Sequence, residues 1–312
     1  MASSLNIFFL QIVIFLLLAP FVLSATFTIT NNCGYTVWPG ILSGAGTAAL
    51  ATTGFSLSQG ESKTLDAPTN WSGRMWGRTL CSTDSTGKFT CGTGDCGSGK
   101  MECLGGGAAP PATLAEFTLD GSGGMDFYDV SLVDGYNVPM LVVPQGGGGN
   151  CTATGCLVDL NSACPTDLKV VLQTEAGGSE NVACKSACEA FGSAEYCCSG
   201  AYGNPNTCKP SGYSEFFKNA CPRAYSYAYD DKTSTFTCAA ANYIITFCPS
   251  TTSQKASGEN PQAAGVPLTN DTNNMVYLGG DQISFASPAS LPKSLSTILP
   301  LAVILVLLVG LF

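Results

Sequence analysis

Carboxylates are the side chains of this sequence that could carry out chemistry. The chain has 22 aspartates and glutamates, 13 lysines and arginines, a formal net charge of −9 and no histidine. Without histidine, neither a Ser-His-Asp nor a Cys-His nucleophile can form, and a histidine-ligated catalytic metal is excluded as well. If the protein is an enzyme, carboxylates must therefore supply its general acid and its base or nucleophile.

The carboxylates are concentrated in one stretch of the chain. No basic residue lies between Lys100 and Lys169. This stretch contains eight of the acidic residues: Glu102, Glu116, Asp120, Asp126, Asp129, Asp134, Asp159 and Asp167. Gathered in space, such a block makes a negative surface, although a solvated face that only keeps the protein soluble is the simpler interpretation. Nucleic acid is not expected as a partner, because phosphate binding requires clustered basic charge.

Three of these aspartates lie in apolar surroundings. Asp126, Asp129 and Asp134 fall within residues 125–144, an apolar and strand-like stretch. Carboxylates are expected there only if they face a cleft or are paired. Strand alternation does not decide which of them converge. Asp126 and Asp134 are an even number of residues apart and share this parity, so they would point to the same face of a regular strand. Asp129 and Asp134 are an odd number apart and would point to opposite faces unless a bulge or turn intervenes.

Short strands and turns must position these carboxylates. Segments rich in Val, Thr, Phe and Tyr alternate with Gly, Pro and Asn, as in residues 26–30, 35–39 and 114–119. This alternation is typical of strands joined by turns. Together with the 36 glycines of the chain, it predicts a mainly β protein built as a β-sandwich.

Sixteen cysteines lie between Cys33 and Cys248. An even number of cysteines in a secreted chain favours disulfides over metal ligands, so we expect no metal and no cofactor. From Cys151 to Cys238 the cysteines are closely spaced and the apolar runs are short. Crosslinks must substitute for a core there, and residues 186–191 and 213–220 have the cues of short helices.

The N-terminal segment has the pattern of a signal peptide. Residues 7–23 are almost wholly apolar, and the small residues Ser24 and Ala25 follow them. We predict a cleaved signal over residues 1–24, with an N-terminal membrane helix as the alternative.

The C-terminal segment has the pattern of a glycosylphosphatidylinositol (GPI) attachment signal. Residues 298–312 are uncharged and no basic residue follows them, whereas a spanning helix needs about twenty apolar residues and usually a basic stop. Small residues at 284–290 precede a spacer that contains Lys293. We predict a removed GPI signal over residues 291–312 behind a Ser/Thr/Asn/Gly/Pro-rich stalk over 250–290, with a transmembrane anchor as the alternative.

The two ends together predict a protein of the secretory pathway that is held on the outer face of the plasma membrane. Three N-glycosylation sequons begin at Asn70, Asn150 and Asn270. Because Asn150 adjoins Cys151, which is expected to be paired, we predict glycosylation at Asn70 and Asn270.

One motif carries a specific resemblance. Residues 87–96, Gly-Lys-Phe-Thr-Cys-Gly-Thr-Gly-Asp-Cys, followed by Gly99 and Cys103, resemble the signature of the thaumatin-like proteins, a plant defence family that includes thaumatin, osmotin and zeamatin. Supporting motifs lie at residues 31–38, 76–79, 113–116, 133–140 and 224–227. The resemblance covers residues 25–249. It implies a flattened β-sandwich with two smaller disulfide-rich subdomains and a cleft between the sandwich and the larger subdomain.

The resemblance also implies eight disulfides. The pairing order of the family gives Cys33–Cys248, Cys81–Cys91, Cys96–Cys103, Cys151–Cys238, Cys156–Cys221, Cys164–Cys184, Cys188–Cys197 and Cys198–Cys208.

A set of cleft residues follows from the same resemblance. Antifungal members of the family carry an arginine, a glutamate and three aspartates in an acidic cleft. The matching positions here are Arg74, Glu116, Asp129, Asp134 and Asp230. One departure is Arg223, where many relatives have an aspartate, and this arginine adds positive charge near the residues that form the cleft.

The resemblance implies a defence or recognition protein that binds β-1,3-glucan or a similar wall polysaccharide in the acidic cleft, with antifungal action as an expected role. The predicted anchor, which lies outside the resemblance, adds that this protein acts at the cell surface. Carboxylates accept hydrogen bonds from sugar hydroxyls. Tyr128 and Tyr136 are candidates to stack on sugar rings unless they belong to the core. We expect the protein to act as a monomer.

Two other functions stay open. In the first, the protein is a weak β-1,3-glucanase, with Glu116 as general acid and Asp129, Asp134 or Asp230 as base or nucleophile. In the second, the tethered domain has a structural or receptor-like role and binds a wall component or another surface protein. A membrane tether favours this role over that of a freely diffusing antifungal protein.

Overall fold

The computed structural model describes residues 25–173, 177–250 and 279–280. The predicted signal peptide, the predicted GPI signal, Asn270 and nearly all of the predicted stalk lie outside these residues. Within the described part of the chain, no helix is long and apolar enough to cross a membrane.

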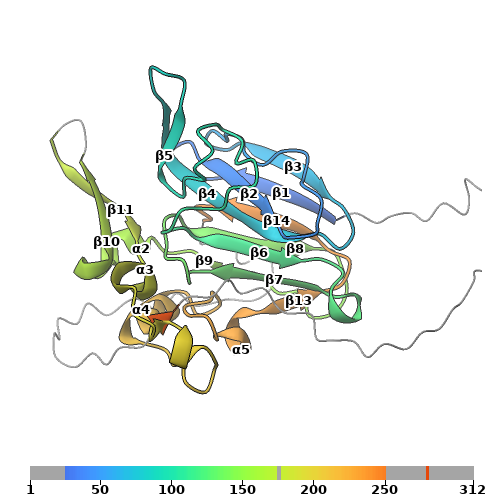
Figure 1. The fold of residues 1–312 in the computed structure, drawn as a ribbon. Helices are drawn as coiled ribbons and strands as arrows, with labels where there is room; N and C mark the ends of the chain where they lie inside the picture. The colour runs from blue at the N-terminus through green and yellow to red at the C-terminus, as the bar shows by residue number, and fades with distance from the viewer. Residues whose placement is uncertain (1–24, 174–176, 251–278, 281–312) are drawn as a thin grey trace, which may run out of the picture.

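Two sheets pack against each other to form a sandwich (Figure 1). The first has the order β3 (Ser62–Ala67), β1 (Ala25–Asn31), β14 (Asn242–Phe247), β8 (Met140–Gln145) and β9 (Thr154–Cys156). The second has the order β13 (Phe236–Cys238), β7 (Asp126–Ser131), β6 (Leu114–Thr118), β4 (Ser72–Thr83) and β2 (Trp38–Ser43). The far end of β4 also pairs with β5 (Phe89–Thr93) and forms a projecting arm.

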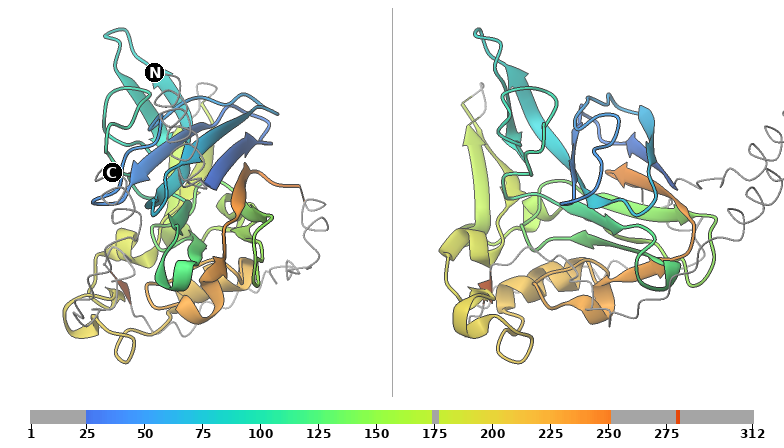
Figure 2. Two further views of the ribbon diagram at one scale, coloured as in Figure 1. Left: turned by 90° about the vertical axis from the view of Figure 1, so that its right-hand side faces the viewer. Right: turned by 45° about the vertical axis from the view of Figure 1, so that its right-hand side comes forward.

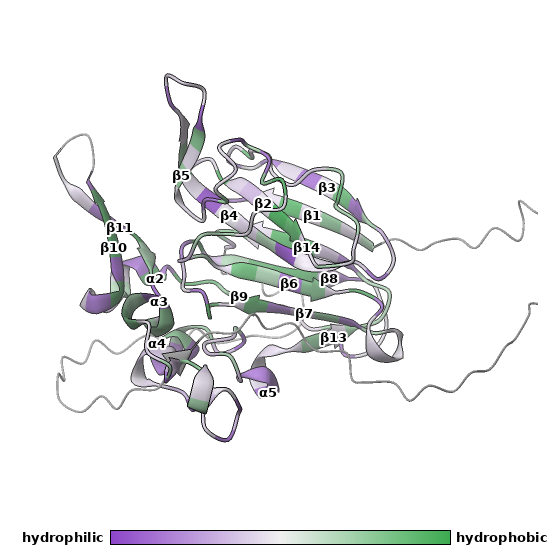
Figure 3. Ribbon diagram, in the orientation of Figure 1, coloured by the Kyte–Doolittle hydropathy of each residue, from purple (hydrophilic) through white to green (hydrophobic). Residues whose placement is uncertain are grey.

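Aromatic side chains from both sheets fill the space between them. In β1, Phe27 and Ile29 are fully buried while the threonines between them are partly exposed, as a half-buried strand requires. The Phe27 ring lies 4.7 Å from that of Phe117 in β6, and the Phe117 ring lies 5.1 Å from that of Tyr243 in β14. Figure 3 shows hydrophobic residues along β1, β6, β7 and β8. Burial of each such ring contributes roughly 1.5–3 kcal/mol to stability.

The rest of the chain forms short elements. Figure 2 shows the helical part of them, in yellow and orange, below the sandwich in both views, whereas the yellow-green hairpin of β10 and β11 stands beside the sandwich in the right-hand view. They are α2 (Leu160–Ala163), β10 (Lys169–Gln173), β11 (Ser179–Cys184), α3 (Ala187–Phe191), β12 (Tyr196–Cys197), α4 (Gly212–Ala220) and α5 (Asp231–Ser234). Three 3-10 turns, at Ser122–Gly124, Thr166–Leu168 and Gly200–Tyr202, and the pairing of β15 (Gly279–Gly280) with β12 complete the described chain.

Serine caps begin the two predicted helices. The Ser186 side chain accepts a hydrogen bond from Glu189 N at the start of α3, and Ser211 forms a capping box with Ser214 at the start of α4. Both helix predictions are confirmed. The predicted strand over residues 35–39 is confirmed for its second half, because Val37 pairs with Leu57 in a β-bridge and β2 begins at Trp38, whereas Tyr35 and Thr36 precede it. The side-chain amide of Asn31 donates to Tyr35 O at 2.8 Å and holds the preceding residues in a turn.

All eight predicted disulfides are present, and no cysteine is free. Cys33–Cys248 joins the ends of the neighbouring strands β1 and β14. Two disulfides lie in the arm, and five lie within residues 151–238, which we call the crosslinked region. The expectation of a β-sandwich with two disulfide-rich subdomains is confirmed.

Candidate functional site

Arg74, Glu116 and Asp129 stand side by side on three neighbouring strands. Arg74 in β4 is opposite Glu116 in β6, which is in turn opposite Asp129 in β7. Opposite residues on antiparallel strands have Cβ atoms about 4.5–5.5 Å apart, and the Arg74 Nη1 to Glu116 Oε1 distance is 4.0 Å. The residues that flank them along the strands, such as Ala115 and Val130, are fully buried in the core. Side chains alternate along a strand, so the row faces away from the core.

A turn brings Asp134 to the same side. Strand β7 ends at Ser131, and Gly135 N donates to Leu132 O at 3.0 Å to close a turn over residues 132–135. Gly135 has φ +83°, a conformation that suits glycine. Alternation no longer holds beyond the strand, and the charge of Asp134 acts on Glu116. This turn resolves the parity question that the sequence left open.

Asp126 lies on the face of β7 opposite to Asp129, and its role is structural. It is 3% exposed, and it accepts hydrogen bonds from Tyr243 Oη at 2.7 Å and from Asp120 N at 3.0 Å. Both bonds satisfy a carboxylate at the edge of the core, which a buried charge requires. Asp126 is therefore separated from the cleft carboxylates.

The environment of the row favours protonated carboxyls. Burial raises the pKa of Glu116 to about 7; the Arg74 charge opposes this shift and the Asp134 charge adds to it. Burial also raises the pKa of Asp129 well above its usual range, with further contributions from Glu116 and Asp231. Within the described residues, Asp129 Oδ1 is buried without a hydrogen-bond partner. Glu116 and Asp129 therefore retain a proton at pH values at which solvated carboxyls have lost theirs.

Asp230, the fifth residue implied by the resemblance, is engaged in holding its own loop. Its Oδ2 lies 2.8 Å from Lys218 Nζ in α4 and accepts hydrogen bonds from Ser226 N and Oγ, both at 3.1 Å. Its side chain is 12% exposed. The lysine neutralises this carboxylate, so Asp230 contributes less negative charge to the cleft than the resemblance implies.

Asp231 is a cleft carboxylate that the sequence interpretation missed. Its charge raises the pKa of Asp129, and its Oδ1 accepts a hydrogen bond from Tyr225 Oη at 2.9 Å. The Tyr225 main chain runs beside β7, donating to Val130 O and accepting from Leu132 N, each at 2.8 Å. The adjacent pair Asp230-Asp231 was a visible signal, but which of the two faces Asp129 depends on the Lys218 contact.

Glu189 of α3 provides a carboxylate on the other wall of the cleft. Burial raises its pKa to about 7; Lys185, whose Nζ lies 3.9 Å from Glu189 Oε1, opposes the shift, and Asp134 adds to it. The charge of Asp134 thus acts on both Glu116 and Glu189, so Asp134 lies between the sheet and α3. No sequence pattern marked Glu189, because its place in the cleft is set by tertiary packing.

Tyr128 and Tyr136 do not line the cleft: of the two alternatives, the place in the core is confirmed and the stacking on sugars is wrong. They are 1% and 0% exposed. Their hydroxyls donate to Thr152 O at 2.7 Å and to Val158 O at 2.9 Å. Both are core residues. Arg223, the departure from the family pattern, places its guanidinium 4.6 Å above the Phe236 ring.

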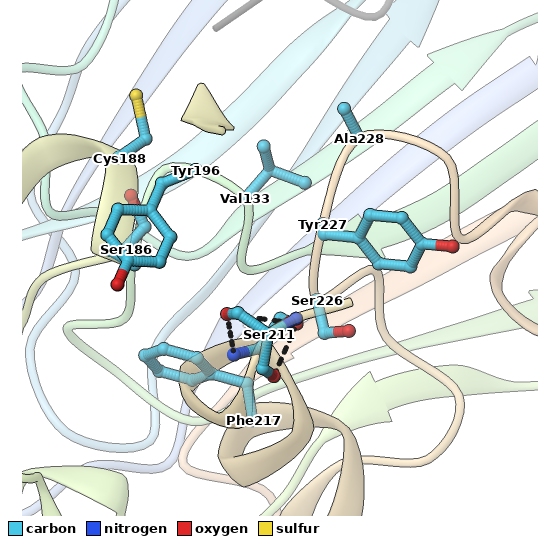
Figure 4. A pocket seen from close by; sticks show the side chains of 11 residues that line it. Val133, Ser186, Cys188, Tyr196, Ser211, Phe217, Ser226, Tyr227 and Ala228 are labelled. Carbon is cyan, nitrogen blue, oxygen red and sulfur yellow. Dashed lines mark hydrogen bonds between the residues drawn. The ribbon is translucent and has the colours of Figure 1, made fainter. Parts of the chain in front are cut away.

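A small hollow of about 30 Å³ adjoins the cleft (Figure 4). Its lining comes from both sides of the cleft. Val133 lies in the turn after β7, whereas Tyr196, Phe217, Tyr227 and Ala228 lie in the crosslinked region. Val133 directly precedes Asp134, so the hollow continues the acidic site.

Comparison with known proteins agrees with this architecture. Residues 31–249 match the Thaumatin family. Thaumatin-like protein 1 of Arabidopsis thaliana is 62% identical over 234 residues, which cover 72% of this chain and 86% of that protein. Pathogenesis-related protein 5 of the same species is 56% identical and covers 79% of this chain and 98% of that protein.

A third relative has an enzymatic name. The glucan endo-1,3-beta-glucosidase of Prunus avium is 54% identical, covering 72% of this chain and 91% of that protein. The family match spans more than half of the chain and covers the two disulfide-rich parts and the sandwich, apart from most of β1. The chain belongs to the thaumatin family.

Proposed function

We propose that this protein binds β-1,3-glucan, or a closely similar wall polysaccharide, in the acidic cleft as a monomeric defence or recognition protein. The row of Arg74, Glu116 and Asp129 carries the proposal. Ionised carboxylates accept hydrogen bonds from sugar hydroxyls, whereas arginine and protonated carboxyls donate them, so one row offers both kinds of partner. The name of the Prunus avium relative supports glucan as the ligand class.

Isothermal titration with laminarihexaose tests this proposal. We expect Glu116→Gln combined with Asp129→Asn to weaken binding about tenfold, since each lost hydrogen bond is worth roughly 0.5–1.5 kcal/mol. Asp66→Asn, at an exposed position in β3, is the control for loss of a carboxyl elsewhere on the surface and should bind like the wild type. Absence of binding by folded wild-type protein would refute the proposal.

Weak hydrolysis of the same glucan is a second candidate function. The observation that favours it is the pKa of Glu116 of about 7, which keeps an acid beside a second carboxyl, that of Asp129, at neutral pH. In the form of the pair that holds a single proton, Glu116 would protonate the leaving oxygen and the ionised Asp129 would attack as nucleophile. Residues opposite each other on paired strands lie close enough for their carboxyls to be near neighbours, and a short carboxyl separation predicts a retaining enzyme.

The release of reducing ends from linear β-1,3-glucan tests hydrolysis, and NMR of the first product tests its stereochemistry. We expect retention of the β-anomer and loss of release in Glu116→Gln. Release that persists in Glu116→Gln, or is absent from the wild type, would leave binding as the function.

We propose that the mature chain begins at Ala25 and that its domain, residues 25–249, is held at the cell surface by a GPI anchor behind the stalk over residues 250–290. Such a tether favours recognition at the cell's own wall over antifungal action at a distance. We also propose glycans at Asn70 and Asn270; Asn70 is exposed in the turn before β4. Phosphatidylinositol-specific phospholipase should release the protein from cells, and glycosidase treatment should lower its mass. Retention on cells after the phospholipase would favour a spanning helix.

A further inference from the structure

The hollow beside the cleft has the size of a small chemical group. Its volume of about 30 Å³ gives room for about two water-sized atoms, since one such atom needs roughly 10–15 Å³ of this space. In Figure 4, Tyr196 and Tyr227 stand on opposite sides of the hollow, and Val133 lies between them. Aromatic and aliphatic surfaces therefore form much of its wall.

The polar groups of the wall are neutral and already bonded within the protein. Ser226 Oγ donates to Asp230 Oδ2 at 3.1 Å, Ser211 Oγ accepts from Ser214 N at 3.1 Å, and Ser186 Oγ accepts from Glu189 N at 3.2 Å. A serine hydroxyl has one donor and two acceptor sites, so each retains some bonding capacity. The hollow thus suits an uncharged group that has an apolar atom and one hydroxyl.

The hollow is placed to meet a sugar held by the carboxylates. Val133 lies next to Asp134, whose charge acts on Glu116, and Tyr227 is close enough to Asp230 and Asp231 for both charges to act on its hydroxyl. Tyr227 is half-buried in the wall, unlike the core residues Tyr128 and Tyr136. Tyr227 is therefore an aromatic side chain of the cleft that a sugar substituent can contact.

Building on the proposed function, we infer that the hollow receives the hydroxymethyl arm of a hexopyranose unit, with Tyr227 as the contact surface. A hydroxymethyl group has two heavy atoms, one apolar and one hydroxyl, which matches the volume and the wall. A pentopyranose lacks this arm and leaves the hollow unfilled. The hollow therefore makes the cleft selective for hexose polymers over pentose polymers of the same linkage.

The test compares laminarihexaose with β-1,3-xylohexaose, which has the same length and linkage but no hydroxymethyl groups. We expect wild-type protein to bind laminarihexaose at least about tenfold more tightly, the discrimination that one small group in a fitted pocket provides. Ala228→Leu fills the hollow and should weaken laminarihexaose binding until the two affinities are within about twofold, with β-1,3-xylohexaose binding unchanged. Ala228→Ser is the matched control and should retain the wild-type ratio.

Variants of Tyr227 keep the inference testable if Ala228→Leu fails to fold. Tyr227→Phe retains the ring and should retain the preference, whereas Tyr227→Ala should lose most of it. Equal wild-type affinities for the two hexaoses, or a preference that survives both Ala228→Leu and Tyr227→Ala, would overturn the assignment of the hollow and leave glucan binding intact. No wild-type binding of laminarihexaose would overturn the proposed function and this inference with it.

Discussion

The two walls of the acidic cleft are held in place by different forces. On the sandwich wall, Glu116 and Asp129 project from paired strands whose opposite faces carry Phe117 and Tyr128, packed in an aromatic core. On the crosslinked wall, Glu189 projects from a helix of five residues that is tied down by Cys188–Cys197. A helix that short does not form alone in water.

This difference shows that a packed sandwich and a disulfide-crosslinked segment can both raise the pKa of a buried carboxyl. Burial raises the pKa of Glu116 and of Glu189 to about 7 in both cases. One carboxyl depends on hydrophobic packing, which any core substitution weakens, and the other depends on covalent crosslinks, which a reductant removes. The two walls should therefore respond to different perturbations.

The largest effect is expected from the sandwich core. Phe117→Ala removes a ring, 3% exposed, that contacts Phe27, Tyr128 and Tyr243. It should lower the free energy of unfolding by about 3–5 kcal/mol, measured by denaturant titration under non-reducing conditions. Phe191→Ala, at a side chain that is 44% exposed in α3, is the control and should cost much less. Equal losses would show that the two regions do not differ in their dependence on packing.

Removal of one crosslink comes next in size. Replacing both Cys164 and Cys184 by alanine opens a link across 20 residues and should cost about 2–4 kcal/mol. Amide exchange should accelerate in α3 more than in β6. Replacing Cys81 and Cys91 in the arm is the matched control, because it should leave exchange in α3 unchanged. Uniform acceleration after the first change would contradict the separation of the two walls.

A pH-dependent effect of intermediate size is expected at Glu116. Below the ordinary pKa of 4.5 this carboxyl is protonated in both the folded and the unfolded chain; between pH 4.5 and about 7 the unfolded chain ionises while the folded chain stays protonated, so wild-type stability falls. The side chain of Glu116→Gln does not ionise, so the variant does not lose this stability. The free energy of unfolding of the variant minus that of the wild type should therefore be about 1–3 kcal/mol larger at pH 8 than at pH 4. Denaturant titrations at both pH values measure it.

Glu180→Gln, at an exposed position in β11, is the control for this experiment and should show no such dependence on pH. If Glu116→Gln changes the free energy of unfolding by the same amount at pH 4 and at pH 8, the ionisation of Glu116 is not the cause of the change.

The smallest effect is expected from the surface ion pair of the crosslinked wall. Lys185→Met removes a lysine that is 37% exposed and 3.9 Å from Glu189. Exposed pairs of this kind contribute roughly 0.2–1 kcal/mol, so thermal unfolding should shift only slightly. A loss above about 2 kcal/mol would show that charge, and not the disulfides, holds this wall.

Much of the fold was predictable because the signature around Cys91, Cys96 and Cys103 implied a complete pairing order. The resemblance also selected Glu116 and Asp129, which the strand register places opposite each other. Parity could not place Asp134, because its position depends on a turn that ends the alternation. Glu189 and Asp231 escaped prediction because their roles arise from packing between segments distant in sequence.

The stacking on sugars considered for Tyr128 and Tyr136 failed for a related reason. Tyr128 and Tyr136 lie close in sequence to Asp129 and Asp134, and closeness in sequence suggested a shared surface. On a strand, the residue next to an outward-facing carboxyl faces inward, and Tyr128 accordingly lies in the core.

The disulfide between Cys33 and Cys248 has a mechanical consequence. A pull on the chain after Cys248 passes through that bond to Cys33 and into β1 and β14, which are parallel neighbours inside the first sheet. The row of Arg74, Glu116 and Asp129 stands on the second sheet, outside this load path. Tension on the C-terminal end can therefore be borne by the domain without deforming the surface that meets the ligand.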